Sequence, residues 1–449
     1  MEKGLAAAMP RLSGARVTVM GLGLFGGGVG VTKYLVRSGA RVTVTDQKSA
    51  HDLRESVAAL DGLPVEMHLG GHREEDFRGA DLVVVSPAVP ADSPWPAMAR
   101  GRDTEMNLFF KACRARTIYG ITGSNGKTTT TALVGEILRR GPRRAWVGGN
   151  IGGSLLDRVD EIAPDDVVVL ELSSFQLENL DALGRSPNVS IVMNLTPNHL
   201  DRHGSMEAYA EAKRVIVKHQ RPRDVRVLNA DDPIVSAWSG GPTRFFSLLG
   251  PCDGAWVEGE RVHVGRETLD VSSRRLPGRF NLQNMSAAAA ATAGAFDGWR
   301  DAAERALVEF AGVEHRLEFA GEHGGVKFYN DSIATNPEST LAALDTLTGP
   351  IVIVLGGYDK KLPFDALGKR VRERCRAAVL TGDTAEAIDG AIGGGILRVR
   401  TRSFDDAVHA ARSLAREGDT VLLSPACASY GMFRNFAERG RRFKEIIAR

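Results

Sequence analysis

A short glycine-rich segment followed by Gly-Lys-Thr has the residue types that bind the phosphates of a nucleotide. The chain reads Thr-Gly-Ser-Asn-Gly-Lys-Thr-Thr-Thr over residues 122–130. Backbone N–H groups in such a turn and the positive end of a following helix attract an anion, the Lys127 ammonium adds a cation, and the Thr128 hydroxyl could hold Mg²⁺. The general phosphate-loop pattern has four residues before its Gly-Lys, whereas only two separate Gly123 from Gly126 here. The segment must therefore be judged together with its neighbours.

The residues on either side predict a strand before this segment and a helix after it. Residues 117–121 are apolar enough for a buried strand, and residues 132–140 have the composition of a helix. An ordinary glycine turn without a ligand is the alternative interpretation, but it gives the lysine and the flanking elements no purpose. The sequence therefore predicts a nucleotide-binding unit whose phosphate loop follows a strand.

Candidate acidic and histidine residues lie farther along the chain. Glu171 follows the apolar residues 167–170, which read as a strand, and this position is more typical of a buried group beside a ligand than of a solvated glutamate. His199, Asp201 and His203 could be read as a zinc cluster, but no further cysteine or histidine stands at the spacing that such a site needs. Magnesium, which prefers oxygen ligands, is the favoured metal.

A second glycine cluster follows the strand-like residues 17–20 near the N-terminus. Gly21, Gly23 and Gly26, with Asp46 farther along, satisfy the dinucleotide fingerprint, so an NAD-binding dehydrogenase or sensor is one interpretation. The same turn would direct helix N-terminal amides at any diphosphate, including that of UDP. A third interpretation is that the glycines only allow the strand and helix to pack closely.

Strand-like and helical stretches alternate along the whole chain, which predicts an α/β fold. At 449 residues the chain is too long for one hydrophobic core, and we expect three domains, over residues 1–106, 107–312 and 313–449. The first and third read as Rossmann-like domains and the central one as a P-loop-type domain. Further candidate strands are residues 41–45, 82–85, 189–193, 326–329, 351–355, 377–380 and 420–423.

The composition is that of a globular soluble protein rather than a disordered or fibrous one. Its 57 basic and 55 acidic residues leave a net charge of +2, which gives no electrostatic footprint for nucleic acid. No apolar run approaches the roughly 20 residues of a membrane helix. The 4 cysteines are widely spaced, which fits a reducing compartment. We therefore expect a cytoplasmic monomer that binds neither nucleic acid nor membrane.

The segment at residues 122–130 resembles the ATP loop of the Mur ligases and the folylpolyglutamate synthetases. The block at residues 424–429, with Phe436 and Arg439 behind it, is similar to the Mur ligases that add glutamate, whereas the Asp-Asn-Pro-Arg block of the members that add diaminopimelate or lysine is absent. The resemblance covers nearly the whole chain. It extends through residues 149–152, 171–177, 198–203, 212–213, 280–284, 314–316 and 330–332.

The resemblance implies a three-domain Mur ligase that uses ATP and Mg²⁺ to convert a carboxylate into an acyl phosphate, which then reacts with an amino acid. It implies UDP-N-acetylmuramoyl-L-alanine as the acid and D-glutamate as the amino acid, in the synthesis of peptidoglycan precursors. L-Glutamate is the alternative amino acid. Folylpolyglutamate synthesis is less consistent with the block at residues 424–429.

The resemblance also implies roles for individual residues. The implied ATP contacts are Gly123, Ser124, Asn125, Gly126, Lys127, Thr128, Thr129, Asn281, Asn284, Arg316 and Asp331. The implied catalytic residues are Lys127, Glu171, His199 and Lys213. The implied magnesium ligands are Thr128, Glu171, His199 and Lys213. The last of these resembles the lysine that family members carbamylate with CO₂, a reaction that requires a neutral amine and hence a lowered pKa.

The remaining implied roles concern the two substrates that are joined. The implied contacts to the UDP-linked acid are Leu24, Phe25, Asp46, Gln47, Ser86 and Asn150. The implied contacts to glutamate are Thr335, Lys360, Ser429 and Phe436. Lys361 could substitute for Lys360. Ile333 stands where the family has a lysine, which predicts altered substrate contacts at that position.

Overall fold

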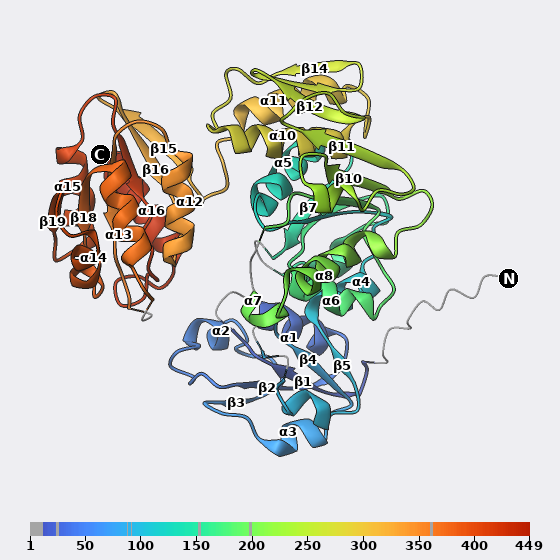
Figure 1. Ribbon diagram of the computed structural model, residues 1–449. Coiled ribbons are helices and arrows are strands. Elements are labelled where there is room, and N and C mark those ends of the chain that lie inside the picture. The colour runs from blue at the N-terminus through green and yellow to red at the C-terminus, as the bar shows by residue number, and fades with distance from the viewer. Residues whose placement is uncertain are drawn as a thin grey trace. The chain divides into compact units, whose positions relative to one another are not determined.

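The computed structural model describes residues 12–23, 27–87, 89–90, 92–150, 154–196, 200–359 and 362–449. Three β-sheets organise these residues (Figure 1). The chain divides into two compact units, one formed by Met1–Ser272 with Leu282–Leu307 and the other by Ser273–Asn281 with Val308–Arg449. Within the described residues no helix is long and apolar enough to cross a membrane.

The first sheet is parallel and has five strands in the order β3-β2-β1-β4-β5. Its strands are β1 (Arg16–Met20), β2 (Arg41–Asp46), β3 (Val65–Leu69), β4 (Leu82–Val85) and β5 (Arg102–Asp103). The helices of this part are α1 (Gly27–Arg37), α2 (Arg54–Ala58), α3 (Glu74–Arg78), η1 (Trp95–Met98) and α4 (Glu105–Ala112). Because β1 lies at the centre, the glycine turn that follows it opens between β2 and β4, where the strand order reverses.

The second sheet also belongs to the first unit and has nine strands in the order β14-β13-β12-β11-β10-β9-β6-β8-β7. They are β6 (Thr117–Thr122), β7 (Ala145–Gly149), β8 (Val167–Glu171), β9 (Val189–Val192), β10 (Val225–Asn229), β11 (Thr243–Ser247), β12 (Gly254–Glu258), β13 (Arg261–Val264) and β14 (Glu267–Asp270). Only the pairs of β13 with its neighbours are antiparallel. The helices are α5 (Lys127–Arg139), η2 (Leu156–Glu161), α6 (Ser174–Asp181), α7 (Leu200–His203), α8 (Met206–Lys218), α9 (Pro233–Ser236), α10 (Arg279–Thr292) and α11 (Trp299–Glu309).

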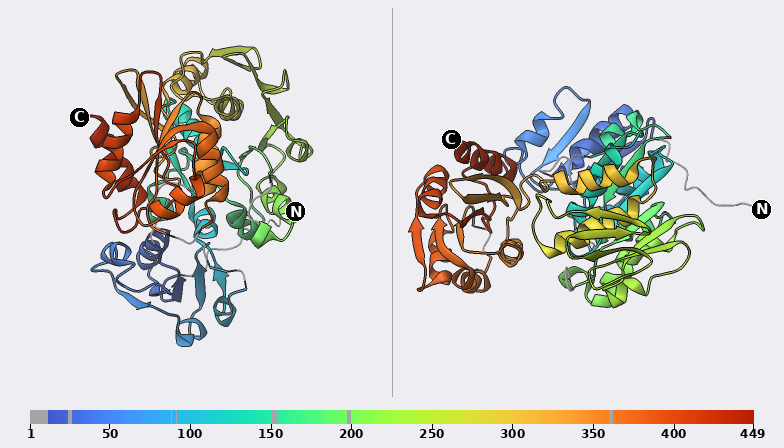
Figure 2. Two further views of the ribbon diagram at one scale, coloured as in Figure 1. Left: turned by 60° about the vertical axis from the view of Figure 1, so that its left-hand side comes forward. Right: turned by 90° about the horizontal axis from the view of Figure 1, so that it is seen from above.

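The sheet of the second unit has six strands in the order β15-β16-β20-β17-β18-β19, and only β15 runs antiparallel to its neighbour. The strands are β15 (Glu318–His323), β16 (Val326–Asn330), β17 (Ile351–Leu355), β18 (Cys375–Leu380), β19 (Leu397–Arg400) and β20 (Thr420–Leu423). One buried cluster packs α12 (Pro337–Thr346), α13 (Asp365–Arg374) and α14 (Ala385–Ile392) on one face. Another packs α15 (Phe404–Leu414) and α16 (Phe436–Ile447) on the other face, as Figure 2 shows. The predicted α/β class is confirmed.

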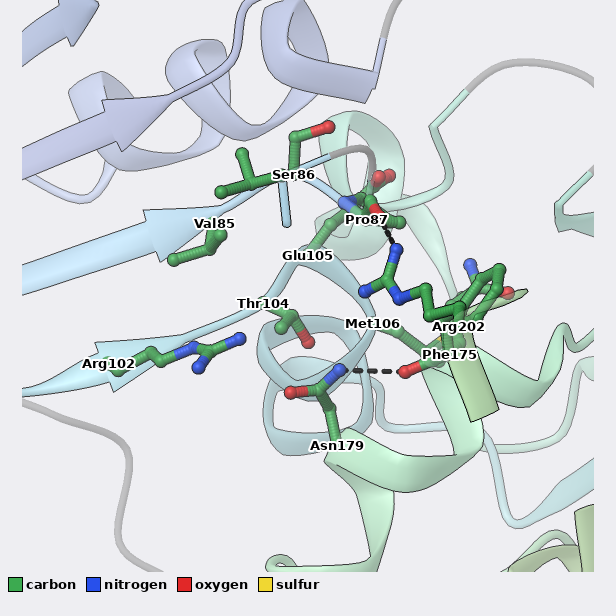
Figure 3. Close-up of a pocket in the computed structure, with 12 residues that line it drawn as sticks. Val85, Ser86, Pro87, Arg102, Thr104, Glu105, Met106, Phe175, Asn179 and Arg202 are labelled. Atoms are coloured by element: carbon green, nitrogen blue, oxygen red, sulfur yellow. Dashed lines mark hydrogen bonds between the residues drawn. The ribbon is translucent and has the colours of Figure 1, made fainter. Parts of the chain in front are cut away.

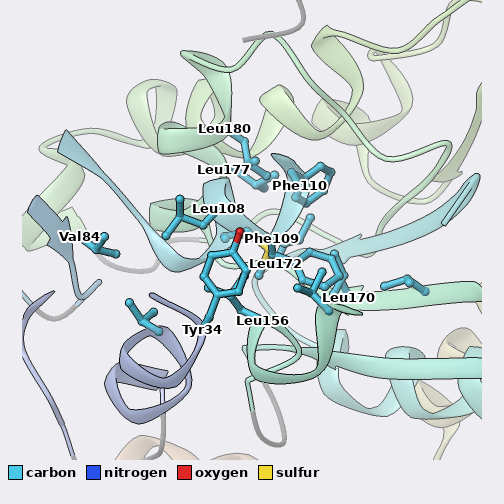
Figure 4. Close-up of a cluster of buried hydrophobic side chains, with 14 of the residues drawn as sticks. Tyr34, Val84, Leu108, Phe109, Phe110, Leu156, Leu170, Leu172, Leu177 and Leu180 are labelled. Atoms are coloured by element: carbon cyan, nitrogen blue, oxygen red, sulfur yellow. The ribbon is translucent and has the colours of Figure 1, made fainter. Parts of the chain in front are cut away.

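The two sheets of the first unit share a hydrophobic core. Residues from β4, β5, α4 and α6 line a narrow pocket between them (Figure 3). A single buried cluster extends from Val84 of β4 through Phe109 of α4 to Leu170 of β8 (Figure 4). Each side chain in this cluster is nearly or fully buried, and its removal from water favours the packed state. The strand ends of the two sheets are therefore held in a fixed relation.

Candidate active site

The predicted phosphate loop joins β6 to α5. Gly126 has φ of +81° and precedes the first residue of the helix, so the turn needs a residue that tolerates the left-handed region. A Cβ at Gly126 would lie 2.5 Å from Asn284 Oδ1, so α10 packs against the turn. The helix begins at Lys127, five residues before the predicted start at residue 132. The N-terminus of α5, with its positive dipole, thus lies at the end of β6.

Two of the loop amides are used inside the protein. Asn194 accepts hydrogen bonds from the Ser124 amide through its carbonyl, at 2.9 Å, and from the Asn125 amide through Oδ1, at 2.8 Å. Lys127 Nζ donates to the carbonyl oxygens of Gly123 and Ser124, at 3.0 and 2.9 Å. The lysine side chain therefore folds back over the loop, and its ammonium lies at the N-terminus of α5. Sequence reasoning gave Asn194 no role.

Thr128 and Glu171 form a buried pair beside this loop. Thr128 Oγ1 donates to Glu171 Oε2 at 2.7 Å, and Asn150 Nδ2 donates to Glu171 Oε1 at 3.0 Å. Glu171 is 2% exposed, so its charge is removed from water while its oxygens meet only neutral donors in these bonds. A hydroxyl and a carboxylate oxygen next to a phosphate loop are the hard ligands that Mg²⁺ prefers. The residues present therefore fit a magnesium ion.

Lys213 lies on α8 close to the same pair. Its side chain is 2% exposed, and Nζ donates to Thr122 Oγ1 at 3.2 Å. Burial, together with the nearby Lys127 ammonium, lowers the pKa of Lys213 to about 7, although the Glu171 carboxylate acts in the opposite direction. A large fraction of the amine is therefore neutral at physiological pH, which is the condition for its reaction with CO₂.

The histidine cluster does not form a zinc site among the described residues. His203 Nδ1 lies 3.1 Å from Glu178 Oε1 and its Nε2 lies 3.0 Å from Ser174 Oγ, so both ring nitrogens have protein partners. No group of three or more His, Cys, Asp and Glu side chains in the described part of the chain could hold a metal. His199 lies outside the described residues.

The N-terminal glycine turn borders a cavity of about 480 Å³. Asp46 helps to shape it, because Oδ2 accepts from the Gly23 amide at 3.2 Å and Oδ1 accepts from the Lys48 amide at 2.9 Å. Gln47 and Ser86 line the same cavity. So do His72 and Trp95, which sequence reasoning missed because an isolated histidine or tryptophan belongs to no motif. Leu24 and Phe25 lie outside the described residues.

In the second unit, Asp331 is buried at the end of β16. Its carboxylate accepts from the Leu317 amide at 3.1 Å and from Ser424 Oγ at 2.7 Å. Burial raises the pKa of Asp331 to about 7, and the hydrogen bonds and the charges of Arg316 and Arg439 only partly offset it. The end of β16 is thereby joined to the end of β20.

Arg439 of α16 joins the same two segments and is fully buried. Its Nε donates to Ser332 Oγ at 3.0 Å, and its Nη2 donates to the carbonyl oxygens of Ser332 and Cys427, at 2.9 and 3.0 Å. Ser332 Oγ in turn donates to the Phe436 carbonyl at 2.7 Å. The structure thus brings the blocks at residues 330–332 and 424–429 together, although the sequence analysis assigned Arg439 no role.

The remaining predicted residues are placed as follows. Asn281 and Asn284 share α10 as predicted and are both buried. Ser429 is buried, Thr335 is half-buried, and the amide of Ile333 donates to the His315 carbonyl at 3.0 Å. Lys360 and Lys361 lie outside the described residues.

Comparison with known proteins gives the family. Residues 15–107 match the Mur ligase MurD-like N-terminal domain, residues 121–292 the Mur ligase middle domain, and residues 315–427 the glutamate ligase domain of Mur ligases. The chain belongs to the Mur ligase family. The glycine cluster of the dinucleotide fingerprint therefore lies within a Mur ligase N-terminal domain, and this argues against the dehydrogenase interpretation. The exact boundaries at residues 106 and 312 stay a prediction.

This Mur ligase is similar over its whole length to curated relatives. It is 43% identical to the UDP-N-acetylmuramoylalanine--D-glutamate ligase of Roseiflexus sp., covering 97% of this chain and 99% of the relative. It is 44% identical to the enzyme of the same name from Symbiobacterium thermophilum, covering 96% and 97%.

Solved structures of Mur ligases share the fold. MurF of Thermotoga maritima, solved in complex with ADP, superimposes with a TM-score of 0.57 at 18% identity, covering 98% of this chain and 99% of that chain. MurF of Acinetobacter baumannii gives a TM-score of 0.58 at 16% identity, covering 97% and 93%. At these identities the likeness concerns the architecture.

Proposed function

We propose that this Mur ligase joins D-glutamate to UDP-N-acetylmuramoyl-L-alanine at the expense of ATP, in the synthesis of peptidoglycan precursors in the cytoplasm. The observation that carries the proposal is the buried group of Thr128, Glu171 and Lys213 beside a phosphate loop, in a chain whose full-length relatives bear the name of that ligase. We expect the enzyme to act as a monomer.

The reaction needs an activated carboxylate, because a free carboxylate has no good leaving group. The γ-phosphoryl group of ATP passes to the carboxylate of the acceptor, which gives ADP and an acyl phosphate. The glutamate amine then attacks the acyl carbon, an amide bond forms, and phosphate leaves. Catalysis of this kind rests on positioning and on charge stabilisation rather than on covalent chemistry by the protein.

The chain's own groups supply that positioning. The N-terminus of α5 and the Lys127 ammonium face the phosphates, with the remaining implied contacts along residues 123–129 and at Asn281, Asn284, Arg316 and Asp331. Thr128 and Glu171 would hold one Mg²⁺, and His199 with carbamylated Lys213 a second. When bound, the ions would neutralise negative charge on the phosphates and on the transferring group.

Carbamylation of Lys213 is part of this proposal. The neutral amine attacks CO₂, an N–C bond forms and one proton is released, so that the uncharged amine becomes a carboxylate-like anion able to bind metal. The lowered pKa of Lys213 supports the step. Protein incubated with ¹³C-labelled bicarbonate should show a carbamate carbon by ¹³C NMR, and the signal should be missing from Lys213→Met.

The two substrates occupy different parts of the chain in this proposal. The cavity bordered by Gly23, Asp46 and Ser86 takes the UDP end of the acceptor. Asn150, hydrogen-bonded to Glu171, contacts the acceptor nearer the reacting carboxylate. Glutamate is bound by Thr335, Lys360, Ser429 and Phe436 in the second unit.

The test is phosphate release with UDP-N-acetylmuramoyl-L-alanine, ATP and Mg²⁺, with either D- or L-glutamate, and identification of the product by mass spectrometry. We expect turnover with D-glutamate. Lys127→Ala should lower turnover by about 10²–10³ through loss of charge stabilisation. Lys218→Ala, on the exposed side of α8, is the matched control and should retain activity. Failure to consume ATP with either glutamate would refute the proposal, and preference for the L-isomer would favour the alternative.

A further inference from the structure

Arg202 reaches from the central part of the first unit to its N-terminal sheet. It lies on the short helix α7, and its guanidinium carbon stands 4.1 Å from the centre of the Phe175 ring. Its Nη1 donates to the Pro87 carbonyl at 3.1 Å, as Figure 3 shows. The cation–π contact and the hydrogen bond both restrain the guanidinium, although the side chain is exposed.

This position is next to the N-terminal glycine turn. Pro87 follows Ser86, and a Cβ at Gly21 would lie 2.8 Å from Ser86 Cβ, so that Ser86 packs directly against the turn. Ser86 and Val89 line both the cavity of about 480 Å³ and the narrow pocket that Arg202 lines. The two spaces therefore adjoin at Ser86 and Val89, and Arg202 lines the narrow pocket beside the larger cavity.

The charge around Arg202 favours an anion. Arg102 lines the same pocket, and the one acidic side chain among the described residues that line it is Glu105. Burial raises the pKa of Glu105, which works against its negative charge. Within the described part of the chain Arg202 forms no ion pair with a carboxylate. A guanidinium has five N–H donors, and the bond to Pro87 uses one of them.

We propose that Arg202 is a further substrate-binding residue of this ligase, whose guanidinium binds the diphosphate of the UDP-linked acceptor. The inference rests on the proposed function and adds a residue from the central domain to the binding site of the N-terminal domain. A planar guanidinium fixed by an aromatic face suits bidentate contact with phosphate oxygens, which a lysine ammonium cannot reproduce. Arg202 is three residues after His199 in sequence, so the proposed diphosphate contact and the proposed metal ligand belong to neighbouring positions of the chain.

The test compares UDP with uridine as ligands, by isothermal titration calorimetry on the full-length protein. Loss of a charge-assisted contact worth about 1.5–3 kcal/mol corresponds to a fall in affinity of roughly 10- to 100-fold. Arg202→Ala should show this fall for UDP, whereas its affinity for uridine, which lacks the diphosphate, should stay unchanged. Arg202→Lys should fall between the wild type and Arg202→Ala. Arg214→Ala, an exposed arginine of α8 paired with Glu211, is the matched control and should bind UDP normally.

Three results would count against the inference. Equal affinity for UDP in the wild type and Arg202→Ala would overturn it. An equal loss of affinity for UDP and for uridine would also overturn it. Arg202 would then only hold the Ser86–Pro87 segment of the cavity wall in place through its hydrogen bond to Pro87. If the wild type binds no UDP at all, the proposed acceptor itself fails, which is a distinguishable outcome. In steady-state assays the same variant should raise KM for the acceptor and leave KM for ATP unchanged.

Discussion

Replacement of Lys213 by methionine should stabilise the protein at neutral pH while it removes catalysis. Lys213 is 2% exposed, and its pKa falls from 10.5 to about 7, mainly through burial. Each tenfold change in proton affinity corresponds to about 1.4 kcal/mol, so the charged ammonium costs the folded state roughly 4–5 kcal/mol. Methionine has a similar length and carries no charge, so the variant should avoid this cost.

The stability gained by Lys213→Met must decrease as the pH rises. Below pH 7 the lysine is protonated in both states, and the folded state carries the whole cost. Between pH 7 and 10.5 the unfolded chain keeps the proton while the folded protein releases it, so the stability of the wild type rises with pH. The advantage of Lys213→Met should therefore be largest at or below pH 7 and should vanish near pH 10.5.

Urea denaturation at several pH values between 6.5 and 9.5 measures this difference. The buffers should be free of CO₂ and of divalent metal, so that carbamylation does not alter the wild type. Lys218→Met on the same helix is the control, because Lys218 is exposed and should show little change. A variant that is no more stable than the wild type at pH 7, or whose advantage does not shrink with rising pH, would refute the reasoning about burial.

The remaining predictions concern the second unit and the phosphate loop. Asp331→Asn should be more stable than the wild type by a margin that grows with pH, from about 1–2 kcal/mol at pH 5 to about 4 kcal/mol at pH 7 and above, because the raised pKa makes the buried carboxyl lose stability as pH rises from 3.8 to about 7. Urea midpoints check this, and a pH-independent difference would contradict it. Gly126→Ala should weaken ATP binding and lower the free energy of unfolding by at least the 1–2 kcal/mol expected for a left-handed residue, because φ is +81° and the Cβ would meet Asn284. Gly390→Ala, whose Cβ would have nothing within 4 Å, is its control and should show no loss.

The phosphate loop could be predicted from sequence because its physical requirements are local. A turn that needs glycine, a lysine and a threonine stand next to one another between an apolar run and a helix, so their order alone carries the information. The start of the helix was predicted too late. Residues 128–131 are four threonines, whose β-branched side chains lower helix propensity, and the position at the end of β6 overrides that preference.

The environment of Lys213 could not be predicted in the same way. On an amphipathic helix a lysine normally faces water, and only the packing of α8 against β6 determines that this one is buried. Arg202 and Arg439 are similar cases. Their roles arise from contacts with Pro87, Ser332 and Cys427, which lie far from them in sequence or belong to other elements. Contacts between such distant residues produce no periodic pattern or motif in the sequence from which they could be predicted.

The apolar cluster that extends from Val84 to Leu170 makes it difficult to produce the first two sheets of this ligase as separate fragments. A chain cut between its first two sheets would leave Phe109 and its neighbours facing solvent on both fragments, and each would be prone to aggregate. Chimeras that borrow the N-terminal sheet from another ligase would need to bring along a matching surface of α4 and α6. Heat should melt both sheets in a single cooperative step, because neither retains a complete interior without the other.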